Sequence, residues 1–210
     1  NTFKNPVKTF IPVARISDLL LCPNEKFDFD GKVYTYPETK IVYWAGGNPF
    51  HHHQDLGRLM QAWQKPETII CNEWCWNSLA KRSDIVLPCS TPLEREDVAL
   101  TPRDYYVVKM SKLTEPYGES KSDFEIFKGI ACAMGVESEF TAEKTSDGWI
   151  KWLYMETRKK AVALGLAMPS YEEFDDKGWF KFSDPKEKIV MLEDFRKDPI
   201  KNRLKTPRGK

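Results

Sequence analysis

The stretch IVYWAGGNPFHHHQDLGR, residues 41–58, holds the residues best suited to bind a ligand. Gly46 and Gly47 follow an apolar run, and because neither has a Cβ the backbone can turn sharply and approach a bound molecule closely. The helix expected next presents free N–H groups and a positive dipole end, which suit a phosphate. The chain has neither G-x-G-x-x-G nor G-x-x-x-x-G-K-[ST], so a nicotinamide site or P-loop is not indicated. In the simplest alternative, these glycines only form a tight turn.

All three histidines of the chain stand in one tripeptide, His51–His53. Consecutive residues at a helix start point about 100° apart, so the rings do not converge on one metal ion. We therefore predict no metal site here and favour hydrogen bonding of at least one ring to a ligand. Packing or helix capping is the alternative.

More polar residues follow the ends of later apolar runs. Asn72 and Glu73 leave the second run, and Arg95 follows the third. Arginine suits a diphosphate, because its planar guanidinium donates several hydrogen bonds with a fixed charge. A carboxylate suits guanine, which presents two hydrogen-bond donors side by side. Asp123, at a helix start, can supply such a carboxylate. An Asp at this position is also a common helix cap.

The elements that position these residues alternate between strands and helices. Apolar runs predict strands over residues 40–45, 67–72 and 83–89. Residues 53–64 have amphipathic helical spacing, and residues 76–82 can form a short helix. Strands and helices in this order are typical of a parallel sheet with crossover helices, whose ligands bind outside the carboxyl ends of the strands. We predict an α/β fold, a Rossmann-like three-layer domain with a parallel sheet.

Flanking segments complete the predicted organisation. Residues 1–36 form an approach helix and a hairpin that turns at Asp30-Gly31. Residues 37–166 form the α/β domain, and residues 167–210, rich in Pro, Gly, Asp and Lys, form an extended, irregular surface segment.

Later parts of the α/β domain carry three more regular patterns. Residues 105–110 predict a further strand, and residues 123–134 predict a helix that ends at Gly135. Residues 148–166 predict a second, longer helix.

Composition excludes several classes of function. The chain has 32 Lys and Arg against 31 Asp and Glu, a balance that argues against a nucleic-acid binder. No apolar run reaches the ~18 residues of a membrane span. No signal peptide is visible, and the start without Met suggests a piece of a longer chain. Five cysteines without paired CxxC spacing predict neither a disulfide framework nor a zinc ribbon.

Four stretches carry a resemblance to a known family: IPVARISDLLL, KVYTYPETKIVYWAGGNPFHHHQDLGRL, SDIVLPCSTPLERED and GESKSDFEIF. They resemble the dimethyl sulfoxide, trimethylamine N-oxide and biotin sulfoxide reductases, which hold molybdenum between two molybdopterin guanine dinucleotide molecules. The resemblance runs from about residue 11 to about residue 155. It implies that this chain is a molybdopterin guanine dinucleotide-binding domain of an N-oxide or S-oxide reductase, an oxidoreductase that transfers oxygen atoms at molybdenum.

The resemblance also assigns cofactor contacts position by position. Asn48 and His52 match the contact residues of the NPFHH turn, while Arg95 and Asp123 match further dinucleotide contacts in PLERED and GESKSD. Asn72 departs from the family, which often has His at that position. Together with the glycine turn, the expected cofactor-binding residues are Gly46, Gly47, Asn48, His52, Asn72, Glu73, Arg95 and Asp123.

No catalytic residue is expected in the chain itself. In the family a serine upstream of the matched region holds the metal, so the isolated chain is predicted to be inactive and without bound cofactor. Expected partners are the remaining domains of the parent enzyme, with a c-type cytochrome as a candidate electron donor and no nucleic acid. The periplasm is favoured over the cytoplasm, and three substrates stay open: trimethylamine N-oxide, dimethyl sulfoxide and biotin sulfoxide.

Two other functions compete with this one. The first is a stand-alone α/β nucleotide-binding enzyme, which the missing nucleotide fingerprint and the lack of a nucleophile–base pair count against. The second is a cofactor-free binding module of the same fold. In such a module Asn48, His52, Arg95 and Asp123 would not need to converge on one crevice.

Overall fold

The computed structural model of the chain describes residues 10–101, 104–183, 190–206 and 208–209. The chain divides into two compact units, each with its own hydrophobic core. Unit 1 comprises Asn1–Cys71, Trp76–Val86 and Ile189–Lys210. Unit 2 comprises Asn72–Cys75 and Leu87–Lys188.

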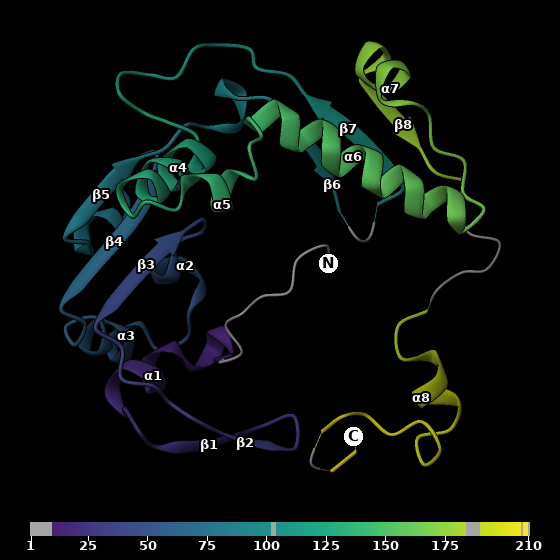
Figure 1. Ribbon diagram of the computed structural model, residues 1–210. Coiled ribbons are helices and arrows are strands. Elements are labelled where there is room, and N and C mark those ends of the chain that lie inside the picture. Colours follow the sequence, from purple (N-terminus) through teal and green to yellow (C-terminus); the bar gives the residue numbers. More distant parts are fainter. Residues whose placement is uncertain (1–9, 102–103, 184–189, 207, 210) are drawn as a thin grey trace. The chain divides into compact units, whose positions relative to one another are not determined.

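The described part of unit 1 begins with a short helix and a hairpin, as the sequence predicts. Its elements are η1 (Val13–Arg15), α1 (Ile16–Leu21), β1 (Lys26–Phe29) and β2 (Lys32–Thr35) (Figure 1). β1 and β2 pair antiparallel. Asp30 and Gly31 turn the chain with φ of 49° and 71°, the positive values that a tight hairpin requires. The predicted Asp-Gly turn is therefore confirmed.

A three-stranded sheet follows, with β3 (Ile41–Ala45), β4 (Thr68–Glu73) and β5 (Ile85–Pro88) in the order β3-β4-β5. At the start of β4, the Thr68 amide donates to the Lys40 carbonyl over 3.2 Å. Just past the end of β5, the Cys89 amide donates to the Glu73 carbonyl over 3.2 Å. Because strand starts pair with starts and ends with ends, the sheet is parallel. The predicted α/β fold with a parallel sheet is confirmed.

The connections between these strands differ from the predicted helices. The helix expected over residues 53–64 is shortened to α3 (Leu56–Ala62), and a separate short helix, α2 (Pro49–His52), precedes it. The helix begins only at Leu56 because Asp55 adopts a left-handed conformation with φ of 50° and caps α3 by accepting from the Arg58 amide.

The helix expected over residues 76–82 is likewise reduced, here to the 3₁₀ turn η2 (Ala80–Arg82). Its first half is replaced by a side-chain turn, in which Asn77 Oδ1 accepts from the amides of Leu79 and Ala80 at 2.9 and 3.0 Å. Local bonds of this kind compete with helical ones, so a helix does not form there.

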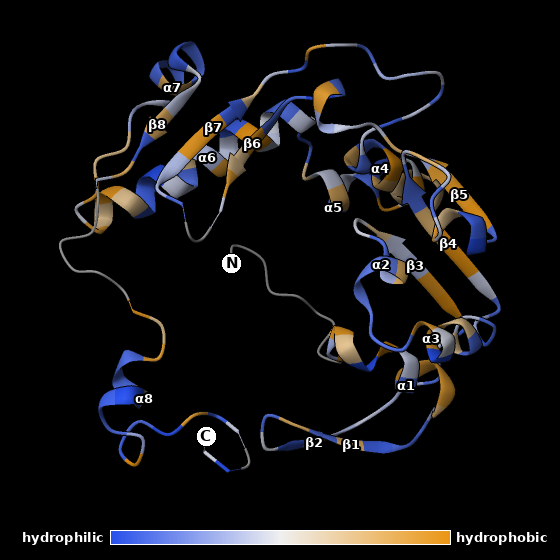
Figure 2. Ribbon diagram, turned by 180° about the vertical axis from the view of Figure 1, so that it is seen from behind, coloured by the Kyte–Doolittle hydropathy of each residue, from blue (hydrophilic) through white to orange (hydrophobic). Residues whose placement is uncertain are grey.

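The core of unit 1 lies where α1 and α3 pack on the strands. Its most buried members are Leu59, Ala62, Cys71 and Leu79, each 0% exposed. Figure 2 shows β4 and β5 as largely hydrophobic ribbons; β4 is largely buried, whereas β5 is exposed at both ends.

Unit 2 combines an antiparallel sheet with helices. Its elements are η3 (Pro92–Glu94), β6 (Asp97–Leu100), β7 (Tyr106–Met110), α4 (Asp123–Ala133), α5 (Glu137–Thr141), α6 (Ser146–Ala163), α7 (Tyr171–Lys177) and β8 (Trp179–Lys181). β7 pairs antiparallel with both β6 and β8, and α6 runs along this sheet (Figures 1 and 2). The strand and the two helices predicted in this region are confirmed, while β6 and α5 had no predicted counterpart. In the described ranges, no helix combines the length and the apolar character needed to cross a bilayer.

The extended surface segment predicted over residues 167–210 is wrong in its first part. That part forms α7 and β8, and its residues Met168, Phe174 and Phe180 belong to the core of unit 2. Ser170 and Glu173 form a capping box that starts α7, a pattern visible in the sequence as Ser-Tyr-Glu-Glu. Further on, α8 (Glu193–Lys197) has no buried residue and fits the prediction of a surface segment better. The predicted three-segment division stays a prediction.

Candidate functional site

The glycine turn after β3 is held by a neighbouring aromatic side chain. Gly46 and Gly47 have φ of 81° and 72°, which an L side chain adopts only with strain. A Cβ on Gly46 would meet nothing within 4 Å, so its glycine is required by the backbone rather than by crowding. The Trp44 indole N–H donates to the carbonyls of Gly46 and Gly47 at 2.9 and 3.2 Å. These bonds fix the turn.

Asn48 comes next and is 7% exposed. Its Oδ1 accepts from the Phe50 amide at 3.0 Å and caps α2. Its Nδ2 donates to Ser78 Oγ at 3.0 Å, which ties the turn to the segment before η2. The Asn48 side chain therefore has a structural role within unit 1, and its predicted contact with a cofactor stays a prediction.

The three histidines differ in their surroundings. His51 and His52 are exposed, and His52 Nε2 lies 4.0 Å from the position that a Cβ on Gly47 would take. His53 is partly buried and meets the Trp44 ring edge-on at 6.1 Å. Burial, and to a smaller extent the neighbouring His52, lower the pKa of His53, so its neutral form predominates at neutral pH. Throughout the described ranges, no three His, Cys, Asp or Glu side chains are grouped as metal ligands.

At the end of β4, two predicted site residues are buried, Asn72 at 3% and Glu73 at 7% exposure. Asn72 Nδ2 donates to Asp123 Oδ1 over 2.8 Å, although the two residues are 51 positions apart. Asp123 is the first residue of α4, whose N-cap is the neighbouring Ser122. Asn72 therefore positions the Asp123 carboxylate, a role that the comparison with the family's usual histidine did not suggest.

Cys89, directly after β5, lies within the electrostatic reach of the other predicted residues of unit 2. Burial, together with the charges of Asp123 and Glu73, raises the pKa of the Cys89 thiol to about 11. The positive charge of Arg95 acts in the opposite direction. Asp123, Glu73 and Arg95 are thus gathered around the segment that leaves β5.

Arg95 is held in place from two sides. Its Nη1 donates to the Ser90 carbonyl at 3.3 Å, while Nε and Nη2 donate to Asp97 Oδ2 at 3.3 and 3.2 Å. Its side chain is 28% exposed, so the guanidinium still reaches solvent. A fixed, partly accessible guanidinium of this kind suits a phosphate group.

The preceding Glu94 has a structural role instead. Its Oε2 accepts from the amide and the hydroxyl of Thr91 at 2.7 and 3.0 Å, and its Oε1 accepts from the Tyr117 amide at 3.0 Å. The hydrogen bond from the Thr91 amide lowers the pKa of Glu94 most. Glu94 therefore stays ionised and fastens the loop around Arg95.

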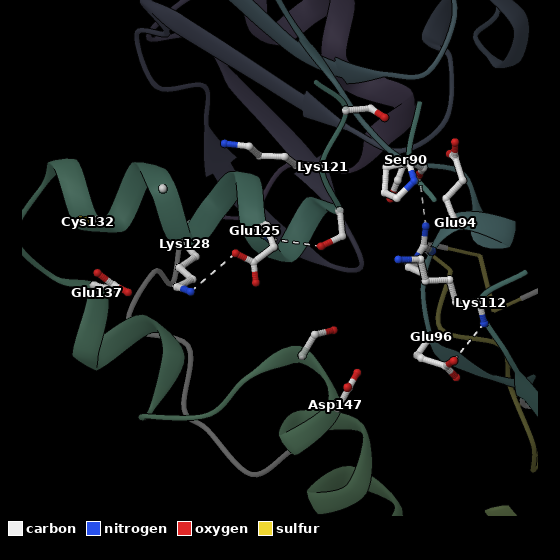
Figure 3. Close-up of a pocket in the computed structure, with 16 residues that line it drawn as sticks. Ser90, Glu94, Glu96, Lys112, Lys121, Glu125, Lys128, Cys132, Glu137 and Asp147 are labelled. Carbon is white, nitrogen blue, oxygen red and sulfur yellow. Dashed lines mark hydrogen bonds and ion pairs between the residues drawn. The ribbon is translucent and has the colours of Figure 1, made fainter. Parts of the chain in front are cut away.

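Arg95 also lines a pocket of about 660 Å³ that lies within unit 2. Lys128 and Cys132 of α4 and Glu137 of α5 stand on one side of it, and Ser90, Glu96 and Lys112 on the other (Figure 3). Ser90 is 4% exposed, and its hydroxyl has no hydrogen-bond partner in the described part of the chain. Sequence reasoning missed Ser90, since a serine after a strand has no distinguishing pattern.

The predicted site residues thus fall into two groups, each brought together within its own unit. Gly46, Gly47, Asn48 and His52 belong to unit 1. Asn72, Glu73, Arg95 and Asp123 belong to unit 2. Fold and site define an α/β protein with polar side chains at the carboxyl ends of parallel strands, the class in which many nucleotide cofactors are bound.

Within that class, comparison with known proteins identifies the family. Residues 19–133, more than half of the 210-residue chain, match the family model described as molybdopterin oxidoreductase. The chain belongs to this family, which implies a molybdenum–molybdopterin cofactor.

Named relatives support the resemblance to the oxide reductases. The chain is 42% identical to a biotin sulfoxide reductase of Cereibacter sphaeroides over 97% of its length and 27% of the relative's. It is 42% identical to a dimethyl sulfoxide/trimethylamine N-oxide reductase of the same organism over 96% of the chain and 25% of the relative. It is 41% identical to a trimethylamine-N-oxide reductase of Haemophilus influenzae over 97% of the chain and 25% of the relative. The chain therefore spans about a quarter of the length of these relatives.

A solved structure supports the fold. Acetylene hydratase from Pelobacter acetylenicus superposes with a TM-score of 0.52 over 83% of this chain and 21% of that one. The sequence identity is 20%, so this likeness bears on the fold alone.

Proposed function

We propose that this chain is the part of an N-oxide or S-oxide reductase that binds molybdopterin guanine dinucleotide. The observation that carries the proposal is the 2.8 Å hydrogen bond between Asn72 and Asp123. It holds a carboxylate at the end of the central strand, and leaves the second carboxylate oxygen outside that bond.

The residues of unit 2 fit a guanine dinucleotide by their chemistry. A carboxylate at Asp123 can accept from the ring N–H and the exocyclic amine of guanine, while the Arg95 guanidinium can donate to the diphosphate. The buried Ser90 hydroxyl, which has no partner in the described ranges, is the kind of group that a bound ligand satisfies. The site thus offers an acceptor for the base and donors for the phosphates.

The division of labour follows from this fit. When bound, the molybdenum cofactor supplies oxygen-atom transfer and two-electron chemistry, and the protein supplies binding and orientation. Arg95 and Asp123 would hold the nucleotide end, and Asn72 would keep the Asp123 carboxylate in one orientation. In unit 1, Trp44 fixes the glycine turn, whose proposed contact with the cofactor is made by Gly46, Gly47 and His52.

The parent enzyme's context forms part of the same proposal. Its substrate would be an N-oxide or S-oxide, as in the names of the relatives, and its remaining domains would complete the cofactor site. A periplasmic location and a c-type cytochrome as electron donor complete the picture. Cell fractionation that recovers the parent enzyme only from the cytoplasm would contradict the proposed location.

Nucleotide titrations of the 210-residue chain test the binding role. We expect weak binding of GDP in preference to ADP, because contacts from the rest of the parent are missing. Arg95→Ala should weaken both nucleotides about tenfold, the usual effect of losing a charged hydrogen-bond donor. Asp123→Asn should abolish the preference for GDP, since an amide cannot accept both guanine donors.

A matched control distinguishes an effect of the proposed site from a general effect of surface charge. Lys151→Ala removes an exposed cation of α6 that pairs with Glu172 and lies outside the site. It should leave both affinities unchanged. Binding of GDP that responds equally to Lys151→Ala and Arg95→Ala would contradict the proposed function.

A further inference from the structure

Ser90 is the one residue of the unit 2 pocket lined by Arg95 whose hydroxyl is both fully buried and without a hydrogen-bond partner in the described ranges. Such a group is unfavourable, because it has lost its bonds to water and gained none. With no bond to hold it, the hydroxyl can turn about the Cα–Cβ bond into another staggered rotamer. The wall that Ser90 forms therefore contains an unused donor.

The surroundings of Ser90 show which kind of acceptor this donor would meet. The Ser90 carbonyl accepts from Arg95 Nη1 at 3.3 Å, and its amide donates to the Lys121 carbonyl at 2.9 Å. Both residues line the same pocket, and the Lys121 ammonium makes no hydrogen bond or ion pair with the described residues. A hydroxyl donor beside the Arg95 guanidinium, in a pocket that Lys121 also lines, suits an oxyanion such as a phosphate.

The acidic side chains nearby do not remove this preference. Both oxygens of Glu94 are occupied by Thr91 and Tyr117, and Glu96 Oε1 accepts from the Lys112 amide at 3.0 Å. On the α4 side, Glu125 pairs with Lys128 at 3.6 Å (Figure 3). Glu94, Glu96 and Glu125 are therefore engaged by protein donors, and the remaining acidic residues of the pocket lining are Glu137 and Asp147.

We infer that Ser90 is a further binding residue, which donates its hydroxyl hydrogen to a phosphate oxygen of the ligand held by Arg95. The inference rests on the proposed function and adds a neutral donor to its diphosphate site. It explains why a buried hydroxyl without a partner stands beside that guanidinium.

Removing the hydroxyl should not reduce the stability of the free chain, but it should weaken ligand binding. In the free 210-residue chain, Ser90→Ala should leave the thermal unfolding midpoint equal to or above that of the unchanged chain, because no protein hydrogen bond is lost. With ligand, it should weaken the binding of GDP and of pyrophosphate about tenfold, the usual effect of losing one hydrogen bond to a charged group. Guanosine, which has no phosphate, should bind with the same affinity to Ser90→Ala and to the unchanged chain.

Ser120→Ala provides the matched control. Ser120 lines the same pocket, but its hydroxyl donates to the Tyr117 carbonyl at 2.7 Å. Its removal should lower the unfolding midpoint and leave binding unchanged.

Each remaining outcome decides against the inference. A Ser90→Ala midpoint several degrees below that of the unchanged chain would show that the hydroxyl has a protein partner. Unchanged binding of GDP and pyrophosphate by Ser90→Ala would overturn the role of Ser90 alone, provided that Arg95→Ala still weakens it. If the unchanged chain binds neither GDP nor pyrophosphate, both the inference and the proposed function are contradicted.

Discussion

Cys89 occupies an environment that opposes its ionisation. It is partly buried, and the carboxylates of Asp123 and Glu73 add negative charge around the sulfur. A thiol reacts with alkylating agents as its thiolate, so a raised pKa suppresses reaction at neutral pH. The reactivity of Cys89 therefore reports on the charges that the proposed site gathers.

The pH dependence of Cys89 alkylation provides a first test at this scale. We expect reaction with iodoacetamide to rise with pH through a midpoint near the pKa of about 11. Asp123→Asn should shift the midpoint to lower pH, because removing a negative charge makes the thiolate easier to form. Mass spectrometry of the peptide that contains Cys89 measures the extent of alkylation, and hence the midpoint, in the unchanged chain and in the variant.

Asp147→Asn is the control for this experiment. Asp147 is in the first turn of α6 and is not among the groups with the largest effects on the pKa of Cys89. An equal shift from Asp147→Asn, or none from Asp123→Asn, would contradict the arrangement around Cys89.

At the scale of the elements, strands were predicted more accurately than helices. Continuous apolar runs mark β3, β4 and β5 to within two residues, because buried parallel strands need apolar side chains on both faces. Helix limits depended on single residues with local effects. The left-handed Asp55 divides α2 from α3, and the Asn77 side chain replaces the first turn of the next helix. Periodicity detects neither effect.

The glycine turn makes a prediction about backbone strain. Gly47→Ala should destabilise unit 1 by about 1–2 kcal/mol, because alanine is strained in the left-handed region. The Gly47 φ is 72°, and the added Cβ would meet only His52 Nε2, at 4.0 Å, so crowding contributes little. Chemical denaturation measures the loss.

Gly57→Ala gives the opposite sign in a nearby helix. Gly57 lies in α3 without a positive φ, and its Cβ would make an ordinary contact with Asp55 Oδ1 at 3.7 Å. This change should stabilise by about 0.5 kcal/mol, since alanine restricts the unfolded chain and favours the helix. Equal effects of the two substitutions would contradict the assigned strain at Gly47.

On the scale of the whole molecule, the chain supplies only part of what its relatives contain, about a quarter of their length. The family could be predicted because its sequence motifs are long, while the cofactor-binding residues assigned from those motifs stay predictions. The link between Asn72 and Asp123 could not, since it joins positions 51 apart and depends on the fold. The burial of Phe174 and Phe180 was missed for another reason, because polar residues dominate the surrounding composition.

Truncation tests the place of the C-terminal segment in unit 2. A chain that ends at Leu166 loses Met168, Phe174 and Phe180 from the core, where Phe174 is 1% exposed. Removing one such aromatic side chain typically costs about 3–5 kcal/mol, so we expect unit 2 to unfold. A chain that ends at Ser183 keeps α7 and β8 and should retain the unit.

Hydrogen exchange resolves the outcome by region. Amides of β7 and α6 should lose protection in the chain ending at Leu166 and keep it in the chain ending at Ser183. Full protection in the chain ending at Leu166 would contradict a role of residues 167–183 in the core of unit 2.

Trp44 has a consequence for the polarity of the glycine turn. In a trans peptide the carbonyl and the N–H that follows it point in opposite directions. By binding the carbonyls of Gly46 and Gly47, the indole therefore also sets the direction of the N–H groups of Gly47 and Asn48. Phenylalanine at position 44 could still pack against Trp63, 5.8 Å away, but would not orient these peptides. A single ring nitrogen thus determines which face of the turn donates hydrogen bonds.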